Sequence, residues 1–271
     1  MKIYDCFTYF NETTMLDFRL RYLSEHVDVF VIVESSYTFT RKKKEMTASG
    51  CIKKLPSSIS EKVRLIELRE APWGTSSQQY NWEREYYQRN AITRGLYDLS
   101  DEDYVIITDV DEIPSTNFLR VMPEIAKKRI PGLNINMEMF YYSASNQMFH
   151  NGKPLAWTLP KIIRATHLAN PQTIRDSTKN WRSTTFNGWH FSYMGGQDRV
   201  LEKIKSFAHQ ELNTKEIIEK IPSQIQNNED PFQRRYTFEQ YQGYLPELIY
   251  SNNEYLEYFA LDQKQAKRIN I

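Results

Sequence analysis

Two short apolar runs constrain the fold of this chain more than any other feature of its sequence. Residues 29–33 and residues 104–108 are both rich in Val and Ile. An uninterrupted stretch of this length and composition is typical of a strand buried on both faces, as in a parallel sheet. Helical periodicity precedes the first run and is clearest over residues 11–26. The alternation predicts an α/β fold in which crossover helices cover a mixed, mostly parallel sheet.

The rest of the chain fits a single domain. We expect further strands at residues 3–8, 63–68, 133–142, 161–165 and 188–193, and further helices at residues 76–99, 115–128 and 198–209. No internal repeat or linker divides the 271 residues, a length that suits one large α/β domain. We predict a main domain over residues 1–222. Residues 223–271 are polar and rich in Tyr, and we expect helical segments packed on the same domain.

Composition excludes several function classes. The chain has 35 basic and 34 acidic residues, a net charge of +1, which gives no field to attract nucleic acid. No apolar stretch approaches the roughly 20 residues of a membrane span, and the N-terminus has no signal-peptide core. With two cysteines and no secretion signal, a cytoplasmic protein without transmembrane segment or disulfide scaffold is expected. The aromatic share of 14% suits sugar platforms, although most such rings pack in cores.

An acidic motif follows the second apolar run directly. Asp109 and Asp111 stand two positions apart, so their carboxylates point to the same side of an extended segment. At the carboxyl edge of a parallel sheet, that side faces the crevice in which ligands bind. Two close carboxylates repel each other, and a divalent cation that bridges a diphosphate relieves the repulsion. The alternative is a solvated acidic turn, but the buried strand before the motif favours a site.

Two further segments carry candidate binding residues. In Gly188-Trp189-His190 the glycine indicates a close backbone approach, and a neutral imidazole is a common metal ligand. We therefore expect His190 to bind metal, whereas the four other histidines are assigned structural roles. On the helix expected at residues 76–99, Arg84 and Arg89 are five apart and do not share one narrow face. One of them can reach a phosphate; a salt-bridged helix surface is the alternative.

Five segments together resemble glycosyltransferase family 17, which includes the transferase that adds bisecting GlcNAc to glycoproteins. The matching segments are residues 5–12, 31–39, 89–90, 109–114 and 186–192. They occur in the family's order, and the Asp-Glu-Ile-Pro extension of the acidic motif and the Gly-Trp-His block are more specific together than a bare pair of aspartates. The resemblance implies a GT-A-like, Rossmann-like catalytic domain over residues 1–222. It also implies a nucleotide-sugar donor, with UDP-GlcNAc favoured, a divalent metal (Mn²⁺ or Mg²⁺) and inversion at the anomeric carbon.

These implications give the candidate residues distinct roles in a direct displacement. A metal neutralises the diphosphate leaving group, and we expect Asp111 to be its direct ligand, with His190 closing the coordination. Asp109 is expected to bind through water or to touch the ribose. Glu34, at the end of the first apolar run, is placed to meet the nucleoside or its sugar. The alternative for Glu34 is a partner for one of the two arginines.

A carboxylate must also accept the proton of the acceptor hydroxyl. Asp198 and Asp176 flank the Gly-Trp-His block and are our candidates for this base. The alternative role for Asp198 is a helix N-cap, and Glu138 and Glu112 stay open as further bases.

The acceptor and the function class are less constrained. Animal members of the family carry a membrane anchor and a stem; we expect neither here, and therefore an acceptor that is available in the cytoplasm. It would be a glycan, a lipid-linked saccharide or a small saccharide. Two other functions stay open: a metal-dependent sugar nucleotidyltransferase, which would release pyrophosphate, and a non-catalytic carbohydrate-binding protein, which would bind sugar without metal or nucleotide.

Overall fold

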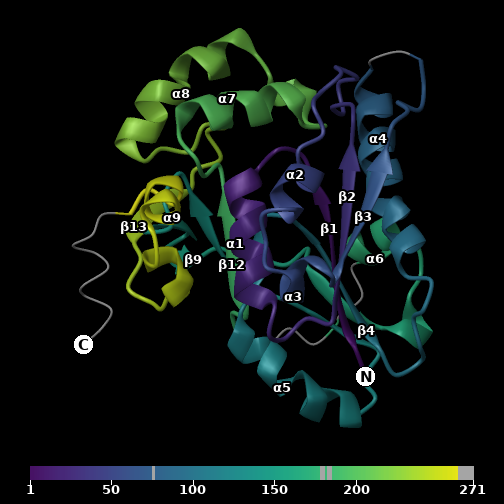
Figure 1. The fold of residues 1–271 in the computed structure, drawn as a ribbon. Helices are drawn as coiled ribbons and strands as arrows, with labels where there is room; N and C mark the ends of the chain where they lie inside the picture. Colours follow the sequence, from purple (N-terminus) through teal and green to yellow (C-terminus); the bar gives the residue numbers. More distant parts are fainter. Residues whose placement is uncertain (75–76, 178–180, 182–184, 262–271) are drawn as a thin grey trace.

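The computed structural model describes residues 1–74, 77–177, 181 and 185–261, which fold around two β-sheets (Figure 1). The first sheet has the order β3-β2-β1-β4-β11-β6. Its strands are β1 (Ile3–Tyr9), β2 (Val29–Ser35), β3 (Val63–Leu68), β4 (Tyr104–Asp109), β6 (Gly132–Asn134) and β11 (Lys161–Arg164). The first four run parallel, and β11 is antiparallel to both of its neighbours. The predicted α/β class is confirmed, with both apolar runs in buried strands of this sheet.

A second sheet of order β13-β8-β7-β12-β5 lies beside the first. Its strands are β5 (Glu112–Pro114), β7 (Met137–Tyr141), β8 (Asn146–His150), β12 (Gly188–Ser192) and β13 (Thr237–Gln240), with short β9 (Lys153–Pro154) and β10 (Ala156–Trp157) paired to β8 and β7. The single strand expected over residues 133–142 is wrong, because the chain leaves the first sheet after β6 and enters the second at β7. The alternation of apolar and polar residues continues from β6 into β7. It therefore does not show that the two strands belong to different sheets.

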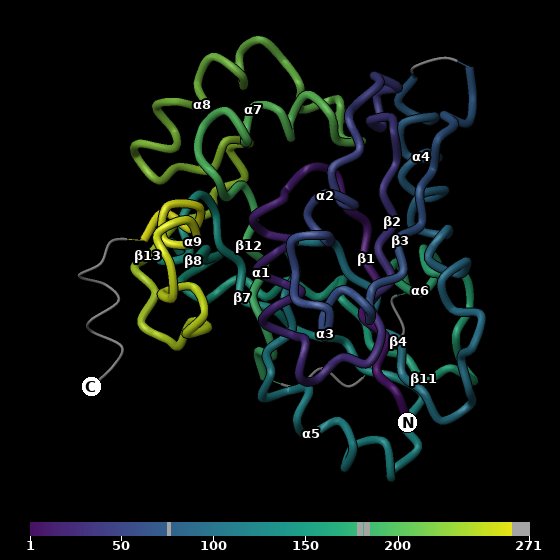
Figure 2. Tube along the Cα trace, viewed as in Figure 1, coloured from purple at the N-terminus to yellow at the C-terminus, as the bar shows by residue number. Residues whose placement is uncertain are grey.

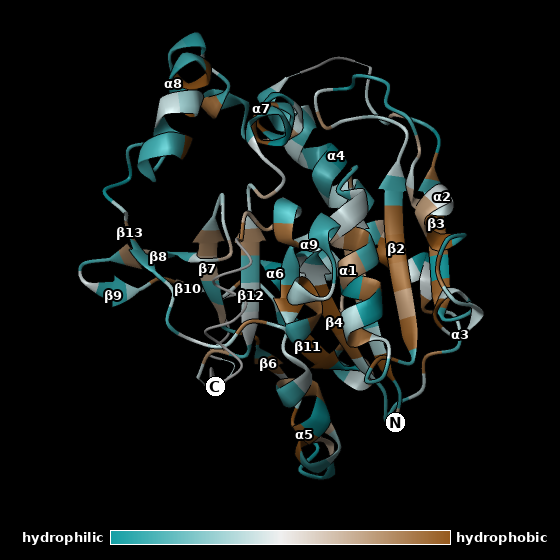
Figure 3. Cartoon of the chain, turned by 60° about the vertical axis from the view of Figure 1, so that its left-hand side comes forward, coloured by the Kyte–Doolittle hydropathy of each residue, from teal (hydrophilic) through white to brown (hydrophobic). Residues whose placement is uncertain are grey.

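Helices cover both faces of the first sheet. They are α1 (Thr13–Leu23), α2 (Ala48–Ile52), α3 (Ser57–Ser60), α4 (Gln78–Asn90), α5 (Thr116–Lys127) and α6 (Pro171–Arg175), with the 3₁₀ helices η1 (Ala91–Gly95) and η2 (Ala165–His167). Successive strand residues face opposite cores, so Phe7 and Ile32 pack with α1, whereas Cys6 and Val31 pack with η1. Figure 3 shows the apolar strands β2 and β4 between more polar helices.

Helix α4 is shorter than predicted. It begins after Ser77, whose side chain accepts a hydrogen bond from the Tyr80 backbone N–H (3.3 Å), while the preceding Ser76 lies outside the described residues. The helix was expected to reach residue 99, but the chain tightens into η1 at Ala91. Within η1 the chain packs closely on β2, since a Cβ at Gly95 would lie 2.4 Å from a methyl group of Val31.

The C-terminal part of the chain packs on both sheets. It contains α7 (Gln197–Ser206), η3 (Gln210–Leu212), α8 (Lys215–Asn227), β13, η4 (Glu247–Tyr250) and α9 (Asn253–Tyr258). Figure 2 traces α9 near α1, and the ring of Phe259, directly after α9, lies 4.9 Å from the ring of Phe18 on α1. Residues 223–271 were expected to be helical, yet they supply strand β13, and residues 262–271 lie outside the described range. Across the described ranges, none of the helices has the length and apolarity to cross a membrane.

A buried arginine fixes the loop that carries the acidic motif. Arg19 of α1 is fully buried and donates two hydrogen bonds to Asp5 of β1, at 2.6 and 2.8 Å. It also donates to the carbonyl oxygens of Asp109 (2.9 Å), Val110 (3.2 Å) and Glu112 (2.7 Å). These carbonyls belong to the last residue of β4, to the loop that follows it and to the first residue of β5. One guanidinium therefore ties helix α1, strand β1 and the loop of the acidic motif together.

Replacing Arg19 by Met should destabilise the fold severely, because it leaves the Asp5 carboxylate buried without its cation. Breaking a buried ion pair in this way costs about 3–5 kcal/mol. Arg21→Met is the matched control, since Arg21 lies on the same helix but pairs with Asp17 near the surface, where such pairs are worth about 0–1 kcal/mol. Urea unfolding measures both variants, and equal losses of unfolding free energy would contradict the assignment.

Candidate active site

A cavity of about 360 Å³ opens at the carboxyl ends of β1 and β4. Its walls come from these two strand ends, the loop after β2, helices α4 and α6, strand β12 and the C-terminal half of α7 with the turn that follows. Ligands of open α/β sheets bind at this edge, and the volume is within the range of small-molecule sites, about 300–1,000 Å³. The cavity is therefore the candidate active site.

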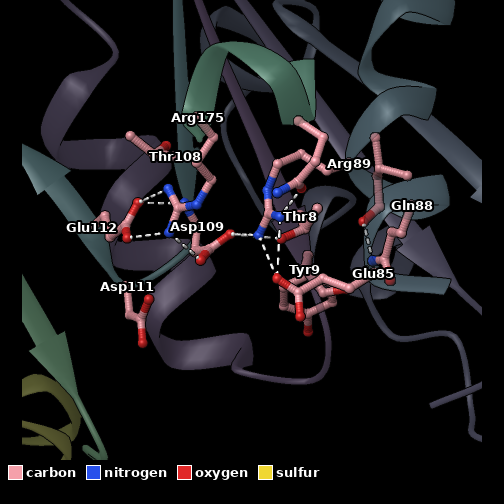
Figure 4. Close-up of polar contacts among 12 residues, drawn as sticks. Thr8, Tyr9, Glu85, Gln88, Arg89, Thr108, Asp109, Asp111, Glu112 and Arg175 are labelled. Carbon is pink, nitrogen blue, oxygen red and sulfur yellow. Dashed lines mark hydrogen bonds and ion pairs between the residues drawn. The ribbon is translucent and has the colours of Figure 1, made fainter. Parts of the chain in front are cut away.

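Asp109 lies on the cavity floor inside a network of cations (Figure 4). Its Oδ1 accepts hydrogen bonds from Arg89 (2.9 Å) and Thr8 (3.0 Å), and its Oδ2 accepts from Arg175 (2.7 Å). Burial by itself would raise the pKa of Asp109, but the guanidinium groups of Arg175 and Arg89 outweigh burial and hold the pKa well below its usual range. Both oxygens thus already have strong partners, so Asp109 organises the site more than it offers free ligand atoms.

Glu112 is the buried counterpart of Asp109 in this network. Arg175 donates to both of its carboxylate oxygens, at 2.8 and 2.6 Å. The backbone N–H of Asp109 donates to Oε2 (2.7 Å) and the indole of Trp157 donates to Oε1 (2.5 Å). The side chain is fully buried and does not line the cavity. Glu112, which the sequence left open as a base, therefore holds Arg175 in place and cannot reach a substrate.

Asp111 faces the cavity from the loop after β4, and His190 approaches it from β12. Oδ1 of Asp111 lies 3.6 Å from Nε2 of His190, and Oδ2 accepts a hydrogen bond from Lys203 of α7 at 2.7 Å. Burial would raise the pKa of Asp111, yet Lys203 and His190 outweigh it and hold the pKa well below its usual range. The fold thus brings together two residues that the sequence separates widely, one with an oxygen donor and one with a nitrogen donor for a metal.

Among the described residues, no cluster of three or more His, Cys, Asp or Glu side chains could hold a metal ion. Asp111 and His190 are thus a pair of potential ligands and not a complete protein cage. Mg²⁺ is commonly bound by one or two carboxylates together with substrate phosphates and water. An ion held in part by a bound diphosphate is compatible with this pair.

Two of the expected donor-binding residues lie outside the cavity lining. Glu34 is buried, where its oxygens accept hydrogen bonds from the Lys44 ammonium (2.8 Å) and from the backbone N–H groups of Thr47 (2.8 Å) and Ala48 (3.0 Å). It therefore holds the start of α2, and its cation is a lysine and not an arginine. Arg84 donates to backbone carbonyls, among them Phe39 (2.9 Å). It braces loops around the cavity without facing it, whereas Arg89 does line the cavity.

The three remaining candidate carboxylates differ in their position. Asp176 follows α6, is exposed and lines the cavity, and both of its oxygens accept from the Gln172 amide (2.8 and 2.9 Å). Asp198 is exposed in the first turn of α7, outside the cavity lining, and Gly196 occupies the N-cap position instead. Glu138 accepts from Tyr241 (2.6 Å) in the second sheet and does not line the cavity either. Of the three, only Asp176 faces the candidate site.

Sequence reasoning assigned no role to several residues of the site. Glu12, at the start of α1, lines the cavity and accepts the backbone N–H groups of Phe10 (3.2 Å) and Asn11 (3.1 Å) through Oε2 alone. Lys203 and Arg175 both contact the acidic motif. Some signals were present, since Glu12 ends a segment shared with the family and Lys203 belongs to a predicted helix. Tertiary packing brings these side chains close to Asp109 and Asp111, and spacing along the chain does not predict it.

Comparison with known proteins assigns the family. The sequence model described as glycosyltransferase family 17 matches residues 1–245. Among solved structures, 4-diphosphocytidyl-2C-methyl-D-erythritol synthase from Anaerococcus prevotii is 12% identical with a TM-score of 0.35, over 78% of this chain and 98% of that one. The 2-C-methyl-D-erythritol 4-phosphate cytidylyltransferase of Francisella tularensis is 8% identical with a TM-score of 0.38, over 76% and 100%. No curated protein gives a significant match.

The cation network around Asp109 should make stability depend on pH in the acid range. Because the folded-state pKa of Asp109 lies below its unfolded value of about 3.9, its contribution is full above that value and is lost as the pH falls. The stability difference between wild type and Asp109→Asn, measured by urea unfolding, should be larger at pH 6 than at pH 3. We expect a change of about 1 kcal/mol, because the carboxyl of the unfolded chain titrates about 0.9 pKa unit above pH 3 and one unit is worth about 1.4 kcal/mol. A difference that is the same at both pH values would contradict the network.

Proposed function

This chain belongs to glycosyltransferase family 17 and is therefore a glycosyltransferase, and within that activity we propose that it moves GlcNAc from UDP-GlcNAc to a saccharide hydroxyl. We further propose that the transfer needs a divalent metal, Mn²⁺ or Mg²⁺, and inverts the anomeric carbon. The observation that carries the proposal is the approach of Asp111 and His190 at the wall of the cavity, 3.6 Å apart.

The charges of the cavity support a metal-bound diphosphate. The basic side chains of its lining are Lys44, Arg89, Arg175 and Lys203, and the acidic ones are Glu12, Glu85, Asp109, Asp111 and Asp176. With His neutral, the acidic groups exceed the basic ones by one, so a diphosphate anion would enter a cavity that already has a negative balance. In our proposal Asp111 and His190 hold the ion. A divalent cation there supplies charge neutralisation of the leaving diphosphate.

The aromatic side chains of the lining support a nucleoside in the same cavity. Tyr37 and Phe39 follow β2, and Trp82 and Tyr86 face the cavity from α4. Aromatic side chains stack on nucleobases, and one such contact is worth about 1–3 kcal/mol. We place the uracil base among these rings, so that the diphosphate extends toward Asp111.

The chemical step is a single displacement. The acceptor hydroxyl oxygen forms a bond to the anomeric carbon, and the bond from that carbon to the diphosphate oxygen breaks with its electron pair. The hydroxyl proton passes to a carboxylate of the cavity. Glu12 and Asp176 are the carboxylates that we propose for this role, because both line the cavity and neither forms an ion pair among the described contacts. Asp198, which is exposed away from the lining, is not carried into this proposal.

A panel of nucleotide-sugars tests the proposed function. Each donor is incubated with the protein, Mn²⁺ and a mixture of saccharide acceptors, and binding is followed by thermal shift. We expect UDP-GlcNAc to raise the Tm and UDP to be released with a new glycosidic bond. Release of pyrophosphate would indicate a nucleotidyltransferase, and sugar binding without dependence on nucleotide or metal would indicate a binding protein. Either result would overturn the proposal.

Asp111→Asn should lose metal-dependent binding of UDP-GlcNAc while the fold persists, because the amide replaces the anionic ligand. His190→Ala should weaken the same binding through loss of the imidazole. Calorimetric titration of UDP-GlcNAc with and without Mn²⁺ measures both effects. Asp198→Asn and His167→Ala are matched controls on exposed residues outside the cavity lining, and we expect them to bind like wild type. Unchanged Mn²⁺ dependence in Asp111→Asn would exclude Asp111 as a ligand.

The base is identified by Glu12→Gln and Asp176→Asn, which keep side-chain size and remove the proton acceptor. General base catalysis contributes about 10²–10⁴-fold, so at least one of these variants should lose kcat by such a factor at nearly unchanged donor affinity. Wild-type kcat in both variants would show that the proton goes elsewhere.

A further inference from the structure

The four basic side chains of the cavity differ in how fully the fold already uses them. The side chains of Arg89 and Arg175 are only 3% and 5% exposed, and both are bound within the Asp109 network. Lys44 is 10% exposed and is held by Glu34. Lys203 is 31% exposed, and the one carboxylate it contacts among the described residues is Asp111. Lys203 is thus the cation of the lining with the greatest freedom to meet a ligand.

We propose that Lys203 binds the diphosphate of the donor and stabilises the charge that develops on it as the sugar leaves, an inference that rests on the proposed function. An ammonium group has three N–H donors, and the hydrogen bond to Asp111 at 2.7 Å uses one of them. The others are available to phosphate oxygens, which lysine binds as a compact point charge.

The position of Lys203 supports this assignment. Lys203 lies in the second half of α7 and lines the main cavity, and it also lines a smaller cavity of about 20 Å³ together with Glu12 and Asp111. Its ammonium lies 5.2 Å from the centre of the Tyr193 ring, which supports the side chain from below. Lys203 therefore stands where the diphosphate must lie if Asp111 and His190 hold the metal.

Lys203 has two possible partners, the Asp111 carboxylate and the diphosphate of a bound donor. Without donor, Asp111 neutralises the ammonium. When Asp111 binds a cation together with a diphosphate, its charge is shared with that cation, and the phosphate oxygens become the nearest uncompensated anions for Lys203. As the bond from the anomeric carbon breaks, the electron pair moves to the diphosphate oxygen, and Lys203 stabilises it by hydrogen bonds without giving up a proton.

Calorimetric titration with UDP and with uridine tests the role of Lys203. Lys203→Met should bind UDP about 10- to 100-fold more weakly than wild type, the worth of a charge-assisted hydrogen bond. Its affinity for uridine should be unchanged, because uridine has no phosphate. Lys205→Met is the matched control, since Lys205 lies on the same helix, is exposed and does not line the cavity. It should bind both ligands like wild type.

Two further arms separate this inference from the proposed function. Lys203→Arg keeps the charge and should recover most of the affinity for UDP, and in EDTA the wild type should still bind UDP more tightly than Lys203→Met. Equal UDP affinity of wild type and Lys203→Met, with a Tm that shows both are folded, would overturn the inference alone. Failure of the wild type to bind UDP with Mn²⁺ would overturn the proposed function and this inference with it.

Discussion

The buried ion pair between Arg19 and Asp5 is the interaction on which the candidate site depends. The Arg19 guanidinium donates to the Asp5 carboxylate and to three backbone carbonyls between the last residue of β4 and the first residue of β5. A buried cation is tolerated when every donor finds an acceptor, and here these three carbonyls complete the set of acceptors that Asp5 and Thr108 begin. The need to satisfy Arg19 therefore sets the path of the loop, and the loop sets where Asp109 and Asp111 point.

This arrangement gives the two aspartates of one motif different tasks. Asp109 is held by Arg89 and Arg175, and Arg175 is itself held by the buried Glu112. Asp111 lies two residues further along the chain. Its neighbours are Lys203 and His190, both of which line the cavity. Asp109 is held by buried arginines that have structural roles. Asp111 instead contacts side chains that can bind a ligand. Like charges two residues apart are thereby separated by their counter-ions.

Local patterns predicted much of the fold and part of the site. The apolar runs identified β2 and β4, and the position directly after β4 identified the acidic motif. Both predictions succeeded because the apolar pattern of a buried strand is contained in a short segment of sequence. The division into two sheets was missed, since β6 and β7 continue one alternation across the switch. Glu34 looked like a ligand residue because it ends a buried strand, but tertiary contacts with Lys44 and the start of α2 use its oxygens. Arg19 and Lys203 were missed because their contacts with the acidic motif join segments that are 90 or more positions apart.

Determining the structure of the protein with UDP and Mn²⁺ tests the central claim most directly. The account predicts a diphosphate in the cavity of about 360 Å³, a single cation in contact with both Asp111 and His190, and a phosphate oxygen within hydrogen-bond distance of Nζ of Lys203. A diphosphate bound away from the carboxyl ends of β1 and β4, or a cation held by residues other than Asp111 and His190, would contradict it.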